Sequence, residues 1–290
     1  MMVAIASGKG GTGKTLLTSG LARVAAADGQ APIYVLDCDV EEPNAHLFLH
    51  PTIDRSEDVA VPVPRVDPAR CALCGRCAEV CAFHALAVVR QKVLVFPELC
   101  HGCGSCIRRC PKQAISEEPS HLGQIELGHA GTIHFARGLL DVGQAMATPV
   151  IRQLKRRAMP PAGEPALVLL DAPPGNACPV VETLRGSDLA LLITEPTPFG
   201  LHDLEIAVQI ARDELQLPVG IVVNRDGVGD RSVDEYCARA GLPILLRIPL
   251  DRRIAEAYAD GQLWVDALPE YAEPLRHLCR ELLGPTEASR

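Results

Sequence analysis

The chain has 290 residues, of which 48% are hydrophobic and 22% are charged, and its formal net charge is −8. This composition is typical of a folded soluble protein, and the length predicts about two domains. The acidic balance and the aromatic content of 3% argue against nucleic-acid binding through a basic face or by base stacking. No apolar run reaches the ~18 to 20 residues that span a bilayer, so we expect a cytoplasmic protein without membrane attachment.

The first 50 residues predict a strand, a glycine-rich loop, a helix and a second strand. Val3–Ala6 is a short apolar run, and a helical pattern of apolar residues follows from Leu16 to Val24. Ile33–Leu36 has the composition of a buried strand, and Asp37 comes directly after it. A short apolar run that enters a glycine loop and then a helix is the usual beginning of a parallel α/β sheet.

The loop between this strand and helix has the sequence of a P-loop. The pattern Gly-x-x-x-x-Gly-Lys-Thr spans residues 8–15, in the strand–loop–helix context that the motif requires. Backbone N–H groups and the positive end of the helix would hold nucleotide phosphates. Lys14 would contact the β- and γ-phosphates, and the Thr15 hydroxyl would bind Mg²⁺. The other loop residues expected at the nucleotide are Gly8, Gly10, Gly11, Thr12 and Gly13.

The amino-acid composition changes at residues 51–66, which contain proline, acidic residues and valine at alternating positions. This change indicates a domain boundary. A cysteine repeat follows, in which each copy has the spacing Cys-x-x-Cys-Gly-x-Cys-x-x-x-Cys. Residues 86–96, between the copies, have strand character with a polar turn near Arg90. The first copy contains Cys71, Cys74, Cys77 and Cys81, and the second contains Cys100, Cys103, Cys106 and Cys110.

This spacing is that of bacterial ferredoxins, whose cysteines bind 4Fe–4S clusters. Three closely spaced thiolates from one loop reach three irons of a cubane, and the fourth thiolate must come from elsewhere. In two-cluster ferredoxins the fourth cysteine of each run serves the other cluster. We therefore expect Cys71, Cys74, Cys77 and Cys110 at the first cluster, and Cys100, Cys103, Cys106 and Cys81 at the second. Zinc, which paired Cys-x-x-Cys units also bind, is the alternative metal.

The α/β pattern returns after a segment rich in Gly and His, residues 123–143. The predicted strands are 166–170, 189–194, 219–223 and 244–248. The predicted helices are 150–157, 201–214, 233–240, 253–259 and 271–283. Buried strands that alternate with helices imply parallel pairing. The apolar positions of the last helix fit packing onto the core better than membrane binding.

The loop contains a second lysine, Lys9, and here the sequence resembles the deviant Walker A ATPases, the family of MinD, ParA, Mrp and the nitrogenase iron protein. Lys9–Thr15 match that family's Lys-Gly-Gly-x-Gly-Lys-Thr loop at every fixed position. The resemblance implies an ATPase that forms a homodimer around the nucleotide, with Lys9 reaching the phosphates bound by the partner subunit. An added cation would stabilise the charge that develops during phosphoryl transfer.

Three acidic residues match family positions near the phosphates. By this likeness Asp39 would orient the attacking water, and Asp37 would hold a water bound to Mg²⁺. Asp171 begins a segment, Asp-Ala-Pro-Pro-Gly, that resembles switch II, and it matches the Walker B acid. An aspartate at the carboxyl end of a buried strand is where an α/β sheet places Mg²⁺ chemistry. The expected catalytic residues are Lys9, Lys14 and Asp39, and the expected magnesium residues are Thr15, Asp37 and Asp171.

Residues on the base side follow two later strands. Asn224 ends the strand 219–223, where the family hydrogen-bonds the adenine, and Pro249 and Asp251 occupy the next loop. A GTPase would have Asn-Lys-x-Asp at this place, but the acid of Asn-Arg-Asp-Gly comes one position early. We therefore expect ATP rather than GTP.

These patterns together predict an α/β fold, a mostly parallel P-loop sheet flanked by helices, with a small inserted α+β ferredoxin-like domain. The expected limits are 1–62 and 119–290 for the ATPase domain and 63–118 for the 2×(4Fe–4S) domain. The combination resembles MinD-superfamily ATPases that carry a ferredoxin domain inserted after switch I.

Four cysteines lie outside the repeat. Cys38, Cys237 and Cys279 fit small buried hydrophobic residues. Cys178 stands seven residues after Asp171, where the nitrogenase iron protein has a cysteine that binds a cluster across its dimer. The second, upstream cysteine that such a cluster requires is missing from residues 129–143, which disfavours a subunit-bridging cluster.

The predicted function is a homodimeric ATPase whose nucleotide state is coupled to electron transfer through two clusters, with an unidentified redox protein as partner. Switch segments held by the γ-phosphate and released on hydrolysis are a common two-state element, and the insertion begins shortly after Asp39. One alternative is a carrier or assembly ATPase that delivers iron–sulfur clusters as cargo. Another is a spatial organiser of the MinD or ParA kind, with the ferredoxin as a docking module.

Overall fold

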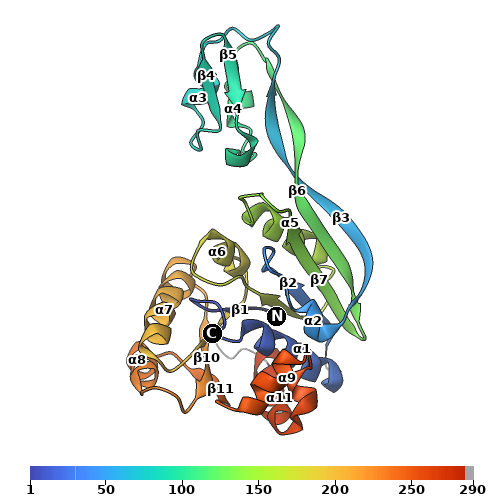
Figure 1. Ribbon diagram of the computed structural model, residues 1–290, viewed down its shortest axis with the longest axis vertical. Coiled ribbons are helices and arrows are strands. Elements are labelled where there is room, and N and C mark those ends of the chain that lie inside the picture. The colour runs from blue at the N-terminus through green and yellow to red at the C-terminus, as the bar shows by residue number, and fades with distance from the viewer. Residues whose placement is uncertain (30, 285–290) are drawn as a thin grey trace.

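The computed structural model describes residues 1–29 and 31–284, and its centre is a nine-stranded sheet (Figure 1). The strand order is β11-β10-β9-β1-β8-β2-β7-β6-β3. The strands of this sheet are β1 (Met2–Ala6), β2 (Ile33–Asp37), β3 (Thr52–Val66), β6 (Ile115–Ala130), β7 (Ile133–Leu140), β8 (Leu167–Asp171), β9 (Leu189–Thr194), β10 (Val219–Asp226) and β11 (Ile244–Pro249).

Helices cover both faces of the sheet. One layer contains α1 (Lys14–Asp28), α2 (His46–Leu49), α9 (Arg252–Ala259), α10 (Trp264–Ala267), the 3-10 turn η3 (Pro269–Tyr271) and α11 (Ala272–Leu283). The opposite layer contains α5 (Thr148–Ala158), α6 (Cys178–Leu184), α7 (Pro198–Val208), the π-helical turn η2 (Gln209–Glu214) and α8 (Ser232–Ala240). The two-residue period of a strand divides the core between the layers: Val3 and Ile5 pack with α1, whereas Ala4 packs with the opposite layer.

The seven strands from β11 to β7 are all parallel, so the expected α/β fold class is confirmed. Each predicted strand is present, and the predicted helix 201–214 is α7 followed by η2. The predicted helix 271–283 is α11, and it packs on α1 through Leu275, Leu278 and Leu282. In the ranges that the structure describes, no helix is long and apolar enough to cross a lipid bilayer.

Most of residues 51–66 form β3, and most of the segment rich in Gly and His, residues 123–143, belongs to β6 and β7; the sequence pattern did not predict these strands. β3 pairs antiparallel with β6 from Thr52 opposite His129 to Val66 opposite Ile115, and β6 also pairs antiparallel with β7. Several prolines are accommodated because β3 is the edge strand, whose outer N–H positions have no strand to bond. The glycine at position 128 allows close approach of the chains, since an added Cβ would lie 2.0 Å from the carbonyl oxygen of Thr52.

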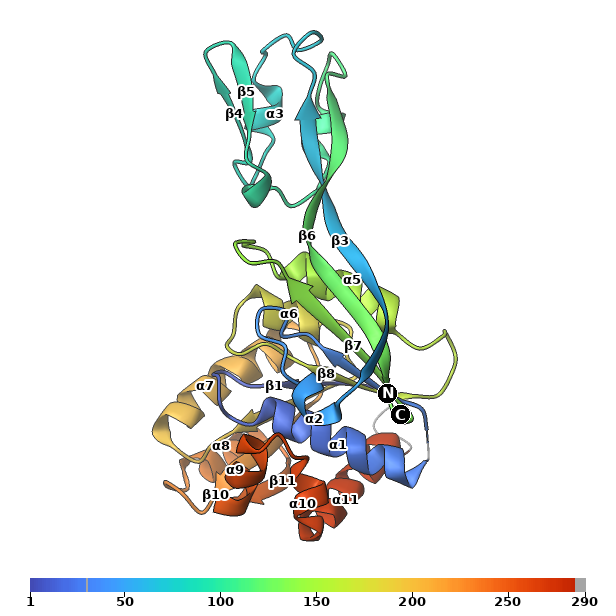
Figure 2. The same ribbon diagram turned by 45° about the vertical axis from the view of Figure 1, so that its right-hand side comes forward.

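Beyond the sheet, β3 and β6 continue as a twisted ribbon with a small unit at its far end (Figure 2). We call residues 67–114 the head, β3 with β6 the ribbon, and the remaining sheet with its helices the body. The head contains α3 (Arg76–Glu79), the hairpin of β4 (Leu86–Val89) and β5 (Lys92–Val95), the 3-10 turn η1 (Pro97–Leu99) and α4 (Ser105–Arg108). The predicted domain limits fall inside β3 and β6, and they stay predictions. Residues 285–290 of the predicted 119–290 segment lie outside the described residues.

Leu154→Ala should lower the free energy of unfolding by about 2–5 kcal/mol, because Leu154 of α5 is fully buried and its loss leaves a cavity. Trp264, the only tryptophan, is buried in the opposite layer, so its fluorescence tests whether both layers unfold together. Urea titrations followed by fluorescence and by circular dichroism should show the same loss. Leu47→Ala, at a side chain that is 52% exposed, should change stability little. A fluorescence midpoint that stays at the wild-type value would contradict one cooperative body.

Candidate functional site: a phosphate loop and two cysteine-lined hollows

The P-loop connects β1 to α1, and glycine permits its backbone conformation. Gly11 and Gly13 have φ values of 75° and 100°, in the left-handed region that glycine adopts without strain. Gly8 packs against α7, where an added Cβ would lie 2.5 Å from the Cβ of Asp203. Since α1 begins directly after Gly13, the unpaired N–H groups of its first turn face this loop. The loop therefore has the form that binds phosphate.

Lys14 and Thr15 open α1 and reach the acidic end of the sheet. Lys14 Nζ donates to Ser7 Oγ at 3.2 Å, and burial lowers the pKa of Lys14. Thr15 Oγ1 donates to Asp171 Oδ2 at 2.6 Å, and Thr18 Oγ1 donates to Asp171 Oδ1 at 3.1 Å. The structure thus brings the predicted Mg²⁺ hydroxyl and the predicted Walker B carboxylate into direct contact.

Two further carboxylates, those of Asp37 and Asp39, lie near Asp171. Asp37 is fully buried and accepts hydrogen bonds from the backbone N–H groups of Asn44 and Ala45, both at 3.0 Å. Burial, with repulsion from Asp171, raises the pKa of Asp37 well above its ordinary value. Burial also raises the pKa of Asp39, and it raises that of Asp171 to about 6. Buried carboxylates that repel one another are stabilised by a cation, so this donor set fits Mg²⁺ and its bound waters.

A pocket of about 1220 Å³, counting its open mouth, lies over the loop and gathers most of the predicted nucleotide residues. Its walls include Gly10, Gly11, Gly13, Lys14, Thr15, Asp39, Asn224, Pro249 and Asp251. The predicted residues that do not line it are Gly8, Lys9, Thr12, Asp37 and Asp171. The loop, the base-side strands and α9 therefore meet at one concave site.

Asn224 and Asp251 are already hydrogen-bonded within the chain. Asn224 Nδ2 donates to the carbonyl oxygen of Thr12 at 2.7 Å, and Asn224 Oδ1 accepts from the N–H of Arg225 at 2.9 Å. The Asp251 carboxylate caps α9 by accepting from the N–H of Arg253 at 2.9 Å. Hydrogen bonds from Arg253 hold the pKa of Asp251 well below its ordinary value. Recognition of adenine by these two residues stays a prediction.

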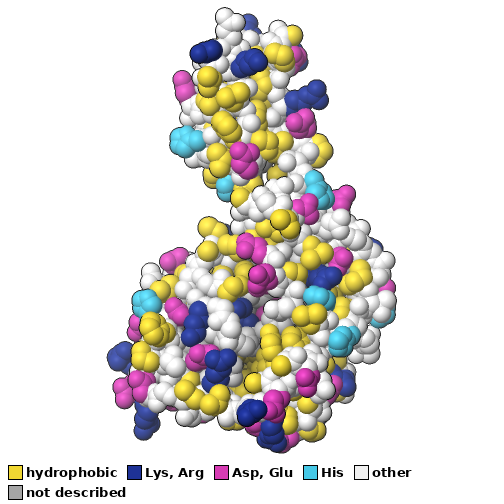
Figure 3. Space-filling model, in the orientation of Figure 1, with side chains coloured by type: hydrophobic (Ala, Val, Ile, Leu, Met, Phe, Trp, Pro, Cys, Tyr) yellow, Lys and Arg dark blue, Asp and Glu magenta, His cyan; other side chains and the backbone are white. Residues whose placement is uncertain are grey.

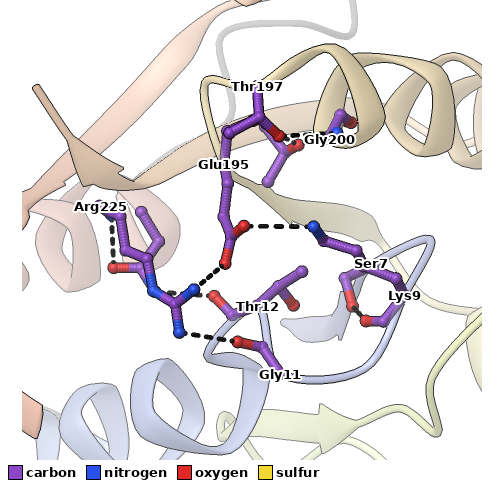
Figure 4. Close-up of polar contacts among 10 residues, drawn as sticks. Ser7, Lys9, Gly11, Thr12, Glu195, Thr197, Gly200 and Arg225 are labelled. Atoms are coloured by element: carbon purple, nitrogen blue, oxygen red, sulfur yellow. Dashed lines mark hydrogen bonds and ion pairs between the residues drawn. The ribbon is translucent and has the colours of Figure 1, made fainter. Parts of the chain in front are cut away.

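Lys9 is held within its own chain by Glu195, which follows β9 (Figure 4). Lys9 Nζ lies 3.2 Å from Glu195 Oε2, and Arg225 Nη1 lies 2.7 Å from Glu195 Oε1. The Glu195 side chain is 9% exposed, so a buried carboxylate joins a P-loop lysine to an arginine of the pocket wall. Glu195 was not among the predicted site residues, although an acid directly after the strand 189–194 is the same signal that identified Asp171.

The apolar wall of the pocket was also missed. Leu250 and one face of α9, formed by Ile254, Ala255 and Tyr258, make up this wall. These three positions of α9 are one and four residues apart, so they share a face of the helix. An apolar wall beside a few convergent polar groups is typical of a small-molecule site. The helical periodicity within 253–259 was the available signal.

The eight repeated cysteines of the head line two separate hollows. The first, which we call the outer hollow, has about 360 Å³ counting its open mouth and is lined by Cys71, Cys74, Cys77 and Cys110. The second, the inner hollow, has about 380 Å³ counting its open mouth and is lined by Cys81, Cys100, Cys103 and Cys106. The structure therefore assembles the two groups of four that ferredoxin spacing predicts, with the fourth cysteine of each copy exchanged.

The sequence repeat is also a structural repeat. The N–H of Ala85 donates to Cys81 Sγ at 3.2 Å, and the N–H of Ala114 donates to Cys110 Sγ at 3.3 Å. The glycines that follow the second cysteine of each copy have positive φ values of 78° and 68°, as expected at tight turns. Hydrogen bonds from N–H groups favour negatively charged sulfur, so these contacts suit thiolates that bind metal.

Each group of four surrounds its hollow and does not converge on a point. Within residues 1–29 and 31–284, no three His, Cys, Asp or Glu side chains lie close enough to hold a single metal ion. The ligands of one zinc ion meet around it at Zn–S distances of ~2.3 Å, whereas the four sulfur ligands of a cubane bind four different irons. Four thiols around each hollow are the donor set that a 4Fe–4S cluster takes, so the residues present fit such clusters.

The other four cysteines lie outside these groups. Cys38, Cys237 and Cys279 are buried, as expected. Burial raises the pKa of Cys237 to about 11 and that of Cys279 to about 12, which keeps these thiols protonated and unreactive. Cys178 is exposed at the first residue of α6.

This chain is similar to curated proteins that include two archaeal proteins and a ferredoxin. The uncharacterized proteins MJ0579 and MJ0578 of Methanocaldococcus jannaschii are 28% and 29% identical to it. The first alignment covers 90% of each protein, and the second covers 97% of this chain and 96% of the relative. Ferredoxin-3 of a Nostoc species is 32% identical over 73 residues, which cover 19% of this chain and 75% of the ferredoxin.

Solved structures share the fold of nearly the whole chain. MinD of Pyrococcus horikoshii, complexed with Mg-ADP, superposes with a TM-score of 0.59 at 18% identity, covering 97% of this chain and 95% of MinD. A ParA family ATPase of Chlorobium tepidum gives 0.57 at 14% identity, covering 97% and 98%. The family described as the CobQ/CobB/MinD/ParA nucleotide binding domain matches residues 3–264. Because this match includes most of the chain, the protein belongs to the CobQ/CobB/MinD/ParA nucleotide-binding family.

Proposed function

We propose that this protein is a homodimeric ATPase whose nucleotide state controls electron transfer through two 4Fe–4S clusters in its head. The observation that carries the proposal is the pair of hollows, each lined by four cysteines, on a ribbon continuous with the sheet of a nucleotide-binding fold. When bound, each cluster would supply a site that accepts and releases one electron. The likeness of part of the chain to a ferredoxin supports this assignment.

ATP and Mg²⁺ would bind in the large pocket over the P-loop. The loop N–H groups and Lys14 would hold the phosphates, and Thr15 with Asp171 would bind the metal. Asp37 would hold one of the metal's waters, and Asp39, on the pocket wall, would orient the attacking water. The contact between Thr15 and Asp171 and the presence of Mg-ADP in the Pyrococcus MinD structure support this arrangement.

The adenine would lie against the apolar face of α9. Asn224, Pro249 and Asp251 line the same pocket beside that face. The second amide hydrogen of Asn224 and the second lone pair of its Oδ1 leave it capacity to bond a base as well as the chain.

Lys9 would act across the dimer. Within one chain its ammonium is paired with Glu195, so this ion pair must open before Lys9 reaches phosphates bound by the partner subunit. The Lys9 side chain is 35% exposed, which leaves it accessible to a second subunit. A cation that joins the phosphates only on association would make hydrolysis depend on dimer formation.

The coupling between nucleotide and head would run through β7. β2 ends at Asp37, and β7 pairs with β2 so that Arg137 lies beside Asp37. The N–H of Leu140, at the end of β7, donates to the carbonyl oxygen of Val40 at 2.8 Å. β6, which forms the ribbon with β3, pairs with the other edge of β7. Movement of residues 38–45 during the nucleotide cycle would therefore act on the strands that carry the head.

Lys14→Ala should weaken ATP binding at least about a hundredfold, because the buried ammonium is the main positive charge at the phosphate loop. The iron content should stay unchanged, since the cysteine groups lie in the head. Binding of a fluorescent ATP analogue and iron analysis of the same preparations measure the two effects. Lys92→Ala, at an exposed lysine of β5, is the matched control and should bind nucleotide like the wild type. Loss of both properties in Lys14→Ala would refute separate sites.

Cys74→Ser should reduce the iron content of anaerobically purified protein from about eight to about four per chain, because one cubane loses a ligand. ATP hydrolysis should persist. Cys178→Ser removes an exposed thiol outside both groups and should retain about eight irons. Wild-type protein that contains zinc instead of iron would refute the cluster assignment.

Replacing MgADP by MgATP should shift the midpoint potentials of the clusters by tens of millivolts, since 59 mV corresponds to a tenfold change in a one-electron equilibrium. Redox titrations followed by electron paramagnetic resonance measure these potentials, and Lys14→Ala should show no shift. Identical potentials with MgATP, with MgADP and without nucleotide would contradict the proposed coupling.

A further inference from the structure

The head differs in charge from the rest of the chain. Residues 67–114 contain seven Lys or Arg and three Asp or Glu, a net charge of +4, although the whole chain carries −8. The remaining residues therefore carry −12. No ion pair in the described ranges includes the cations of the head, and the nearest pair along the chain joins Arg65 to Glu118 of the ribbon. These exposed cations are Arg70, Arg76, Arg90, Lys92, Arg108, Arg109 and Lys112.

The cations concentrate around the outer hollow. Arg70, Arg76 and Arg109 directly adjoin its cysteines in the sequence, and Arg76 and Lys112 line its wall. No Lys, Arg, Asp or Glu adjoins a cysteine of the inner hollow, whose wall includes the carboxylate of Glu117. Within the described residues, the lining of the outer hollow contains two cations and no carboxylate. Only the outer hollow has a cationic mouth.

The outer hollow lies at the free end of the head. Val66, the last residue of β3, and Ile115, the first residue of β6, line it, whereas Pro62, nearer the body, lines the inner hollow. Figure 3 shows Lys and Arg side chains at the end of the head that points away from the body. Leu73, which is 37% exposed, and the exposed Cys74 add apolar surface at the same mouth. The cationic end therefore lies on the side of the head that faces away from the chain's own acidic body.

We propose that the outer mouth, defined as Leu73, Cys74, Arg76 and Lys112, is the docking site of an acidic electron-carrier protein. This inference rests on the proposed function, because the carrier would exchange electrons with a cluster held in the outer hollow. Cations outnumber carboxylates at this mouth, where the Glu79 carboxylate lies beside Gly75. An apolar centre with a net positive charge around it attracts a partner of the opposite charge and orients its approach. A protein is favoured over a membrane or a nucleic acid, because the cations surround a cysteine-lined hollow and form neither an amphipathic helix nor an extended basic stripe.

Binding of an acidic flavodoxin to the anaerobic holoprotein, measured by calorimetry, tests the docking site, and a basic cytochrome c is the probe of opposite charge. Flavodoxin should bind more tightly than cytochrome c at an ionic strength of about 0.01 M and lose affinity at about 0.3 M, where charges are screened. The double variant Arg76→Glu/Lys112→Glu should weaken flavodoxin binding at least about tenfold at the lower ionic strength. The charge-preserving variant Arg76→Lys/Lys112→Arg should bind like the wild type.

Arg231→Glu makes the same kind of charge reversal at an exposed arginine of the body and should leave flavodoxin binding within about twofold of the wild type. Equal weakening by Arg231→Glu, or no weakening by the head variant, would overturn the docking site. Binding of phosphatidylglycerol vesicles or single-stranded DNA through Arg76 and Lys112, without binding of flavodoxin, would overturn the protein partner. Iron analysis separates the two proposals. Protein that contains about eight irons, but whose flavodoxin binding is unchanged by the head variant, refutes the docking site alone. Protein without iron refutes the proposed function.

Discussion

The hydrogen bonding of β7 between β2 and β6 is the contact on which the rest of the architecture depends. On one side β7 continues the parallel sheet, and on the other it starts the antiparallel pair that becomes the ribbon. An isolated two-stranded ribbon is marginally stable in water, so the ribbon needs this sheet as its foundation. The same strand stands beside β2, whose end carries the buried Asp37. One strand therefore supports both the phosphate site and the head.

The parts of the fold that the sequence predicts have local signals. The P-loop combines fixed residue types with a strand before it and a helix after it, and the cysteine repeat has a spacing that few structures share. The ribbon has no such signal, because its prolines and glycines disfavour strands when they are considered alone. They are tolerated because β3 is an edge strand and because Gly128 lies where the neighbouring backbone leaves no room for a side chain. Those conditions depend on pairing partners far away in the sequence.

The same distinction separates the site residues that were predicted from those that were missed. Lys14, Thr15 and Asp171 belong to motifs, whereas Glu195 acquires its role from two cations that lie 186 residues before it and 30 residues after it. A buried carboxylate requires compensating charge, and only the folded chain shows that Lys9 and Arg225 provide it. The face of α9 that walls the pocket likewise depends on how the helix packs into its layer over the sheet, which sequence periodicity alone does not determine.

The length of the ribbon has a mechanical consequence. β3 contains 15 residues, and residues 60–66 extend beyond the part of β6 that pairs with β7; at ~3.3 Å per residue this free part spans about 23 Å. Such an arm is a lever, since a rotation of one degree at its base would displace its tip by about 0.4 Å on this estimate. Small rearrangements beside the phosphates, of a size that leaves the sheet intact, would thereby produce larger displacements of the head. The length of the arm converts a small rotation at its base into a larger displacement of the head.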